Sequence, residues 1–437
     1  MQFYGRDSEK KSLEKIWEQS FNSATMTVIT GRRRIGKTSL ILDTLAGKKN
    51  FVYLFVNRTS EGVLSQSFKQ AIERQCDIRI IGHNLEIHEI LEQLFQYAEH
   101  EQLTLVIDEF QELEFVSKEL FGRLQYIWDM YHQRSKINLI VCGSIYSMMK
   151  RIFENNKEPL FGRMTHKITL KPFRTDTLKQ ILHDHNPNYT PEDLLFLYSL
   201  TGGVPMYVSQ LMNLKATTKD SMIDAVCSVG SRFLNEAPEM LIGEFGRQYT
   251  NYFGILQLIA SGMTSQKEVD SVVGKSTGQY MQLLENEYSL IERNLPFGSK
   301  PGCRNVRWRV SDNFLSFWFR FIAPNSQLTA VGNMALLRET INDEYTQYSG
   351  LMLERYFRQK YSEQERVTEV SAWWDKKGVN EIDLIALYRL DRHALVAEVK
   401  HNKAKIDLQT LNTKATQIKQ FLPRYKIETV GLSMDDM

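Results

Sequence analysis

One segment near the start of the chain, GRRRIGKT at residues 31–38, constrains the fold more than any other. It follows a short apolar segment, MTVITG, and leads into KTSLILDTLAG, which has helical periodicity and ends at Gly47. Strand, loop and helix in this order match the phosphate-binding pattern GxxxxGK[ST], in which backbone N–H groups wrap a phosphate and the helix N-terminus adds a favourable dipole. We expect Lys37 to reach the β- and γ-phosphates and the Thr38 hydroxyl to hold Mg²⁺. A chance glycine-rich turn is the alternative.

Further apolar strands follow the loop, with helical stretches between them. They are FVYLFVN at 51–57, LTLVIDEF at 103–110 and INLIVCGS at 137–144. Near-continuous apolar strands that alternate with helices predict a parallel sheet covered on both faces. The sequence therefore predicts a multidomain α/β protein whose P-loop NTPase core spans residues 1–172.

Polar residues at the ends of these strands supply the remaining chemistry of a nucleotide site. Asp108 and Glu109 follow a buried strand, where ligands bind in open α/β sheets. We expect Asp108 to hold Mg²⁺ and Glu109 to orient or deprotonate the attacking water. The Ser144 hydroxyl either senses the γ-phosphate or caps its strand. Arg163 either reaches a nucleotide in a neighbouring subunit as an arginine finger or forms a surface ion pair.

Helical periodicity replaces the strands after residue 172. Residues 173–248 are predicted to form a helical lid, in which TGGVP separates two helices. Residues 249–325 are predicted to form a winged helix and a joint, with a third helix at 276–295 and a hairpin in FGSKPGCRNVRWRV. The last α/β unit, residues 326–437, is expected to open with a helix that begins near Ser349.

Charged residues mark the strand ends of this last unit. NEIDLIAL carries Asp383, AEVK carries Glu398 and Lys400, and GLMLERYF carries Glu354 on the preceding helix. Glu398 and Lys400 are two residues apart on a strand, so both face the same side. Two carboxylates and a backbone carbonyl are a suitable set for a divalent cation, and a lysine beside them neutralises developing charge. The alternative is an exposed hairpin with charged ends.

Composition narrows the class of protein. The 437 residues carry a net charge of only +2, so any contact with DNA has to come from a local basic patch. Basic residues of the predicted winged helix are candidates for phosphate contacts: Lys275, Arg304, Arg307 and Arg309. The four cysteines show no CxxC spacing, and no run is apolar and long enough for a membrane helix. We expect a cytoplasmic protein without a membrane partner.

Several of these segments together resemble the archaeal-type ATPases of the AAA+/STAND-like group, which also occur in bacteria. They are FYGRDSEKKSLEKIW at 3–17, GRRRIGKTSL, VIDEFQEL, LFGR, TGGVP and DNFLSFWFRFIAPN at 312–325. The resemblance implies an ATP-binding switch, with Gly5 and Arg6 near the adenine and the TGGVP helix in the lid. The expected nucleotide contacts are Gly5, Arg6, Gly31, Arg34, Ile35, Gly36, Lys37, Thr38, Ser39, Asp108 and Ser144.

The terminal unit resembles the restriction-endonuclease-like, PD-(D/E)xK, nucleases. This resemblance implies that Glu354, Asp383 and Glu398 hold Mg²⁺ and that Lys400 assists cleavage of DNA. Three hypotheses therefore stay open: a nucleotide-switched nuclease, a STAND-like regulatory ATPase with a non-cleaving terminal module, and a transcriptional regulator built on the winged helix. A homo-oligomer fits each of them.

Overall fold

The computed structural model describes residues 3–245, 249–376 and 378–437. The chain forms two compact units: Gly5–Lys171, and a second made of Pro172–Met437 together with Phe3 and Tyr4. The division of the second unit into lid, winged helix and terminal domain stays a prediction, because these segments share one hydrophobic core. The predicted boundary at residue 248 lies outside the described residues.

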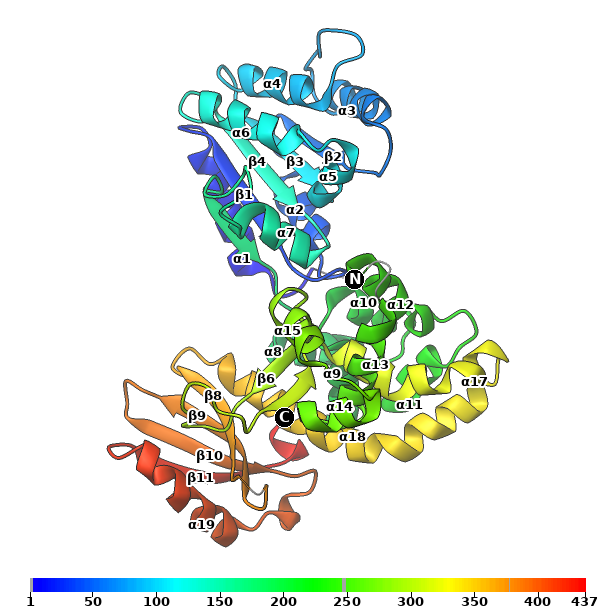
Figure 1. The fold of residues 1–437 in the computed structure, drawn as a ribbon, viewed down its shortest axis with the longest axis vertical. Coiled ribbons are helices and arrows are strands. Elements are labelled where there is room, and N and C mark those ends of the chain that lie inside the picture. Colours follow the sequence, from blue (N-terminus) through cyan, green and yellow to red (C-terminus); the bar gives the residue numbers. More distant parts are fainter. Residues whose placement is uncertain (1–2, 246–248, 377) are drawn as a thin grey trace. The chain divides into compact units, whose positions relative to one another are not determined.

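The first unit is built on a parallel five-stranded sheet of order β2-β3-β4-β1-β5 (Figure 1). Every residue of β1, β3 and β4 is buried, and successive residues of β3 face opposite cores: Leu105 and Ile107 face one and Val106 the other. The predicted parallel sheet with helices on both faces is confirmed. The strands are β1 (Thr25–Thr30), β2 (Phe51–Phe55), β3 (Leu103–Asp108), β4 (Ile137–Cys142) and β5 (His166–Thr169).

Helices cover the two faces of this sheet. Two of them, α1 (Asp7–Gln19) and α2 (Lys37–Leu45), pack on one face. Those on the other face are α3 (Glu61–Gln75), α4 (Ile87–Tyr97), α6 (Leu120–Tyr131) and α7 (Tyr146–Glu154). The helix α2 starts directly at the phosphate-binding loop because Gly36, in the left-handed conformation, ends the loop.

The second unit opens with helices, as predicted. They are α8 (Thr175–His185), α9 (Pro191–Thr201), α10 (Pro205–Asn213), α11 (Lys219–Val226), α12 (Arg232–Phe245), α13 (Tyr249–Ala260), α14 (Gln266–Val273) and α15 (Gly278–Asn286). An antiparallel hairpin of β6 (Ile291–Asn294) and β7 (Arg307–Val310) follows. The predicted third helix at 276–295 is wrong at its end, because Ser289 takes a positive φ and residues 291–294 pair with β7 instead.

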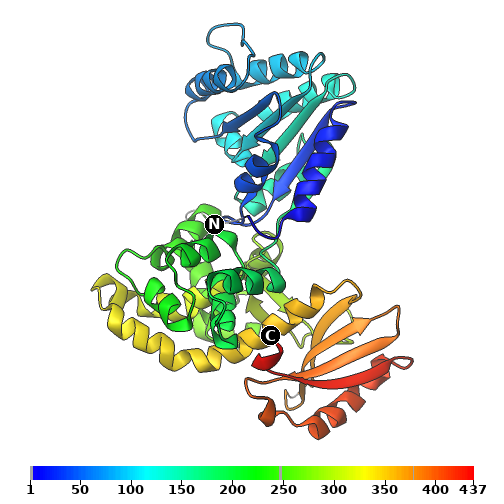
Figure 2. The same cartoon turned by 180° about the vertical axis from the view of Figure 1, so that it is seen from behind.

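The terminal part of the second unit is a four-stranded sheet preceded by a long helix, α18 (Met334–Ser362). This helix begins 15 residues before Ser349, the predicted start, because Asn333 caps it by accepting a hydrogen bond from the Leu336 N–H. The strands β8 (Glu369–Trp374), β9 (Glu381–Tyr388), β10 (His393–Val399) and β11 (Lys426–Leu432) lie in sequence order, and α19 (Leu408–Ile418) joins β10 to its parallel neighbour β11 (Figure 2).

Residues of this sheet face two cores. On β10, Ala394 and Val396 pack with α19, whereas Ala397 and Val399 join the large core that extends from Phe173. The fold class predicted from the sequence is therefore confirmed as a P-loop NTPase sheet followed by a separate strand-rich part. Within the described residues, no helix combines the length and apolarity that a bilayer crossing requires.

Candidate functional site

The phosphate-binding loop is shaped by its two glycines. Gly31 has a φ of +147°, and a Cβ there would lie 2.9 Å from the Leu170 carbonyl oxygen. Gly36 has a φ of +88° and open space around it. Glycine at both positions lets the backbone close into a loop, because other residues rarely adopt these conformations.

Lys37 lies inside this loop. It is 7% exposed, and its Nζ donates hydrogen bonds to the carbonyl oxygens of Gly31, at 2.9 Å, and Arg32, at 3.1 Å. The ammonium group therefore helps to hold the loop in its curved form. The other loop residues from the prediction are placed as follows: Arg34 has a positive φ, Ile35 is buried, and Ser39 is exposed in the first turn of α2.

Arg6 contacts the phosphate-binding loop through hydrogen bonds to backbone carbonyl groups. Its side chain is 6% exposed, and its Nη2 donates to the carbonyl oxygens of Ile35, at 3.3 Å, and Lys171, at 2.7 Å. Burial lowers the pKa of this guanidinium, and the ion pair with Glu9 acts in the opposite direction. Gly5, beside it, has a positive φ and is exposed. The adenine contact predicted for these two residues stays a prediction.

The Asp108 carboxylate accepts hydrogen bonds from several groups of this site. Its Oδ2 accepts from the hydroxyls of Thr38 and Tyr53, each at 2.7 Å. Its Oδ1 lies 3.0 Å from the Cys142 Sγ and accepts from the Glu109 N–H at 2.9 Å. The structure thus brings together the two groups predicted to hold Mg²⁺, and a hydroxyl beside a carboxylate fits a hard cation that takes oxygen ligands.

Sequence reasoning missed Tyr53. Burial, with Asp108 nearby, raises the pKa of this phenol, so it stays protonated and donates. Tyr53 lies on β2, the neighbour of β3, and the register pairs Phe55 with Asp108. The only signal in the sequence was a polar aromatic residue within FVYLF, and that signal is too weak to assign a role.

Glu109 is held by two polar side chains. Its Oε2 accepts from the Ser144 hydroxyl at 2.7 Å and from the Gln111 Nε2 at 2.5 Å. Glu109 also has a positive φ of 55°, a conformation that costs energy in a residue with a side chain. The predicted strand-end residues Asp108, Glu109 and Ser144 therefore form one connected group.

Arg163 lies in a different environment. Its guanidinium forms a two-point ion pair with Asp129, at 3.1 and 2.8 Å, and donates to the carbonyl oxygens of Pro159 and Phe161. Within a single chain, these contacts agree with the second alternative given for Arg163, a surface ion pair. A role as an arginine finger stays a prediction.

A second polar site lies in the second unit, in a cavity of about 950 Å³. Lys400 Nζ lies 3.8 Å from Asp383 Oδ2 and 3.5 Å from Glu398 Oε1. Asp383 Oδ2 also accepts from the Val399 N–H at 2.8 Å, which ties the end of β10 to β9. The structure therefore places Asp383, Glu398 and Lys400 together, as the alternation of the strands predicts.

Glu354 lines the same cavity but has its own partner. Its Oε2 accepts from Arg358 Nη2 at 2.6 Å, and Arg358 Nε donates to the Asp383 carbonyl oxygen at 2.9 Å. Burial raises the pKa of Glu354 to about 7, although the charge of Arg358 lowers it, and the charges of Asp383 and Glu381 raise it further. Burial also raises the pKa of Asp383.

The carboxylates of this cavity meet some of the requirements of a divalent-cation site. Among the described residues, no three His, Cys, Asp or Glu side chains are arranged as metal ligands. Glu398 Oε2, however, is buried without a hydrogen-bond partner, and an unsatisfied buried carboxylate oxygen is costly unless a cation or donor meets it. Asp383 and Glu398 therefore fit a two-carboxylate site better than the predicted set of three with Glu354.

The basic residues predicted to contact DNA lie in different environments, and their contact with DNA stays a prediction. Arg307 forms an ion pair with Glu381 of β9, and Arg309 Nε donates to Glu292 of β6 at 2.5 Å. Both arginines line the cavity that holds Asp383. Arg304 is exposed, and Lys275 Nζ lies 5.3 Å from the centre of the Tyr280 ring.

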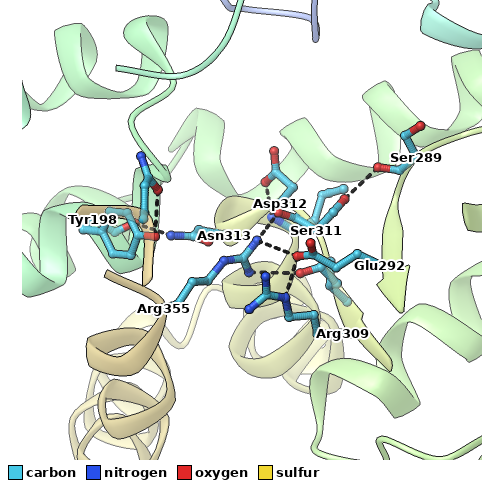
Figure 3. A network of polar contacts seen from close by, with 11 residues as sticks. Tyr198, Ser289, Glu292, Arg309, Ser311, Asp312, Asn313 and Arg355 are labelled. Carbon is cyan, nitrogen blue, oxygen red and sulfur yellow. Dashed lines mark hydrogen bonds and ion pairs between the residues drawn. The ribbon is translucent and has the colours of Figure 1, made fainter. Parts of the chain in front are cut away.

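The base of the hairpin is fixed to α18 by the polar network in Figure 3. Arg355, the neighbour of Glu354, donates from Nη1 to the Val310 carbonyl oxygen at 3.0 Å and from Nη2 to that of Ser311. The Ser311 hydroxyl donates to the Ser289 carbonyl oxygen at 2.7 Å. Burial lowers the pKa of Arg355, and Glu292, 3.5 Å away, favours its charged form.

A parallel sheet of this order, with a phosphate-binding loop and an Asp-Glu pair at a strand end, defines a P-loop ATPase. The family model described as "ATPase domain predominantly from Archaea" matches residues 3–211, and the one described as "Archaea bacterial proteins of unknown function" matches residues 318–418. The chain belongs to this family of archaeal ATPases.

Two relatives illustrate the match. The chain is 30% identical over 414 residues to the uncharacterized protein MJECL04 of Methanocaldococcus jannaschii, covering 92% of this chain and 88% of that protein. The Walker-type ATPase PABY2304 of Pyrococcus abyssi is similar in structure, with a TM-score of 0.57 and 19% identity over 73% of this chain and 96% of that one. At this identity, the structural likeness shows the fold alone.

Proposed function

We propose that the protein is an ATP-driven switch coupled to a metal-dependent nuclease. In the first unit, the loop N–H groups and Lys37 would bind the phosphates of ATP, and Thr38 and Asp108 would hold Mg²⁺. Glu109 would orient the attacking water. Support comes from the connected group of Thr38, Asp108, Glu109 and Ser144 at the end of the central strands.

The observation that carries the nuclease proposal is the meeting of Asp383, Glu398 and Lys400 in one cavity. The order of elements, α18, β8, β9, β10, α19, β11, with β10 and β11 parallel, supports it. The elements thus carry Glu354 on a helix, Asp383 on the second strand, and Glu398 and Lys400 at the end of the third. The resemblance to restriction-endonuclease-like nucleases requires this order.

Each side chain has a role in this proposal. Asp383 and Glu398 would hold the divalent cation, which polarises a phosphodiester when bound. Lys400 would neutralise the charge that develops on the phosphate. Glu354, whose pKa burial raises to about 7, would hold Arg358 and thereby fix the position of Asp383 through the Asp383 carbonyl.

A single experiment tests both halves of the proposal. Labelled DNA and RNA are incubated with Mg²⁺ or Mn²⁺, with and without ATP, for wild type and for Lys37→Ala, Lys400→Ala and Lys403→Ala. The last variant is the control, because Lys403 is exposed and pairs with Asp436 instead. We expect cutting to be lost in Lys400→Ala only, and the effect of ATP to be lost in Lys37→Ala.

The second candidate is a STAND-like regulatory ATPase whose terminal part binds or assembles without cleaving. It is favoured by the pairing of carboxylates with cations of the same chain: Glu354 with Arg358, Glu381 with Arg307, and Asp383 and Glu398 with Lys400. Absence of cutting under every condition, with ATP still bound, would make this candidate the better one.

A further inference from the structure

The hairpin of β6 and β7 is attached to the terminal sheet at its tip and to α18 at its base. The Phe297 N–H donates to the Ala372 carbonyl oxygen of β8 at 2.8 Å. The Phe297 and Phe421 rings lie 6.1 Å apart, edge to face, and a Cβ on Gly298 would lie 2.6 Å from the Phe421 ring. With Arg355 at its base (Figure 3), the hairpin is held at both ends and forms a fixed wall.

Arg307 lies on this wall and faces the cavity. All four residues of β7 line the cavity, but they alternate in burial: Trp308 and Val310 are buried, whereas Arg307 and Arg309 are partly exposed. The two arginines differ, because Arg309 bonds Glu292 of its own hairpin. Arg307 instead crosses to the terminal sheet, where its guanidinium lies 4.5 Å from the centre of the Trp374 ring and pairs with Glu381.

The fold has little need of this ion pair. The side chains of Arg307 and Glu381 are 33% and 36% exposed, and a pair that exposed contributes at most about 1 kcal/mol. The hairpin is already held by Phe297 and Arg355. The guanidinium is therefore positioned in the cavity at low cost. It makes one contact with Glu381, from Nη1 to Oε1, and a phosphate that engages it at two points competes with this single contact.

We propose that Arg307 is a phosphate-binding residue for a single strand of nucleic acid that lies in the cavity beside Asp383, Glu398 and Lys400. This inference rests on the proposed nuclease function, and it names the substrate class of that site. On binding, a backbone phosphate takes the place of Glu381 at the guanidinium, while Trp374 keeps the plane of Arg307 in position.

The size of the cavity selects a single strand. A volume of about 950 Å³ is at the upper end of small-ligand pockets and holds only a few nucleotides. A cavity of this volume does not enclose a duplex, whose major groove alone is about 12 Å wide. A single strand is flexible enough to enter, and cationic grooves commonly bind its backbone.

The test is a binding experiment that does not depend on cleavage. Fluorescein-labelled oligothymidine, oligouridine and a DNA duplex are titrated with the full-length protein in EDTA, and anisotropy is measured at several salt concentrations. The variants are Arg307→Gln and, as the matched control, Arg366→Gln, which removes the same charge from an exposed position outside the cavity lining. Thermal unfolding and ATP hydrolysis verify that each variant is folded.

We expect Arg307→Gln to weaken single-strand binding about tenfold and to lower the salt slope by about one, and Arg366→Gln to change binding by less than about threefold. The two single strands show whether the cavity accepts DNA, RNA or both, and either acceptance supports the proposal. Equal effects of the two substitutions, preference for the duplex, or absence of any binding by the wild type would overturn it.

The outcomes also separate this inference from the proposed function. Binding that depends on Arg307 in a protein that never cuts would refute the nuclease and retain the phosphate site. Cutting by the wild type, with binding unchanged in Arg307→Gln, would refute the phosphate site alone.

Discussion

Asp108 accepts more hydrogen bonds than its sequence motif assigns to it. Thr38 was expected beside it, but Tyr53 and Cys142 come from neighbouring strands, β2 and β4, and their approach depends on the order of strands in the sheet. A motif records residues that are close in the sequence. It therefore predicts the phosphate-binding loop and the Asp-Glu pair but leaves out partners from other strands.

Tyr53→Phe tests whether this partner matters. Removing one hydrogen bond to a carboxylate should lower the free energy of unfolding by about 1–2 kcal/mol. We also expect ATP hydrolysis to need more Mg²⁺, because Asp108 is less firmly oriented. Urea unfolding and a Mg²⁺ titration of ATP turnover measure both. Tyr97→Phe is the control, since that hydroxyl makes only a 3.4 Å bond to exposed Glu101; equal effects would mean that Tyr53 has no special role.

Glu354 should make stability depend on pH. A carboxyl group whose pKa is higher in the folded chain stabilises the fold fully below its unfolded value of 4.5, and this contribution is lost as the pH rises through about 7. The groups around it act in both directions: Arg358 and Lys400 favour its charged form, and Asp383 and Glu381 oppose it. The folded protein is thus less stable at pH 8, where Glu354 is a carboxylate, than at pH 5, where Glu354 is a neutral acid.

Glu354→Gln removes this dependence because glutamine does not titrate. Between pH 5 and pH 8, the free energy of unfolding of the variant should rise relative to wild type by about 2 kcal/mol, given about 1.4 kcal/mol for each unit of pKa shift. Urea unfolding in EDTA, followed by tryptophan fluorescence, measures the difference. Glu339→Gln, at an exposed position of the same helix, should show no such change; a parallel change there would contradict the assignment.

The sequence predicted the positions of the strands well and those of some helix ends poorly. Continuous apolar runs such as LTLVIDEF and the alternation of Glu398 and Lys400 are local patterns, and the strands lie where these patterns place them. The end of α15 depends on Ser289, and the start of α18 depends on Asn333. Each is a single-residue backbone feature within a helical pattern, so periodicity alone could not locate it.

The hairpin shows the same limit on a larger scale. Its basic residues predict a surface for DNA, which stays a prediction, but the sequence did not predict that Phe297 and Arg307 contact the terminal sheet. Nothing in the local sequence of 291–310 records that β8, some 60 residues further on, receives the hairpin. The contact comes from tertiary packing, which also gives the cavity its second wall.

Gly298→Ala should detach the tip of the hairpin. The added Cβ meets the Phe421 ring at 2.6 Å, so either the ring or the hairpin has to move, and their contact is lost. We expect a loss of about 1–3 kcal/mol relative to Gly302→Ala. That control has a similar φ, 80° against 76°, but open space around it, so both variants share the backbone strain. Limited proteolysis of the loop should be faster only in Gly298→Ala; equal rates would mean that the tip is not docked.

The packing of the second unit determines how many independently folding parts it contains. The sequence predicts three segments beyond residue 172. One core extends from Phe173 to Met437 across these segments, and a smaller core lies between the terminal sheet and α19. The helix α18 joins them: Tyr356 packs against Tyr198 of α9 with ring centres 5.3 Å apart, and Tyr345 packs against Phe196 at 5.0 Å. A fragment that lacks α9 would expose these rings to water.

Two fragments of the chain test whether the terminal sheet folds independently. Residues 172–437 retain the shared core, so this fragment should fold and unfold cooperatively on heating. Residues 326–437 lose the partners of Tyr345 and Tyr356, and burying large aromatic side chains is worth roughly 2–3 kcal/mol each; we expect this fragment to aggregate or stay unfolded. Circular dichroism and thermal denaturation compare the two. A cooperative transition in the shorter fragment would show that the terminal sheet is an independent domain. The site of Asp383, Glu398 and Lys400 would then be open to regulation by movement of that domain rather than held fixed by the hairpin.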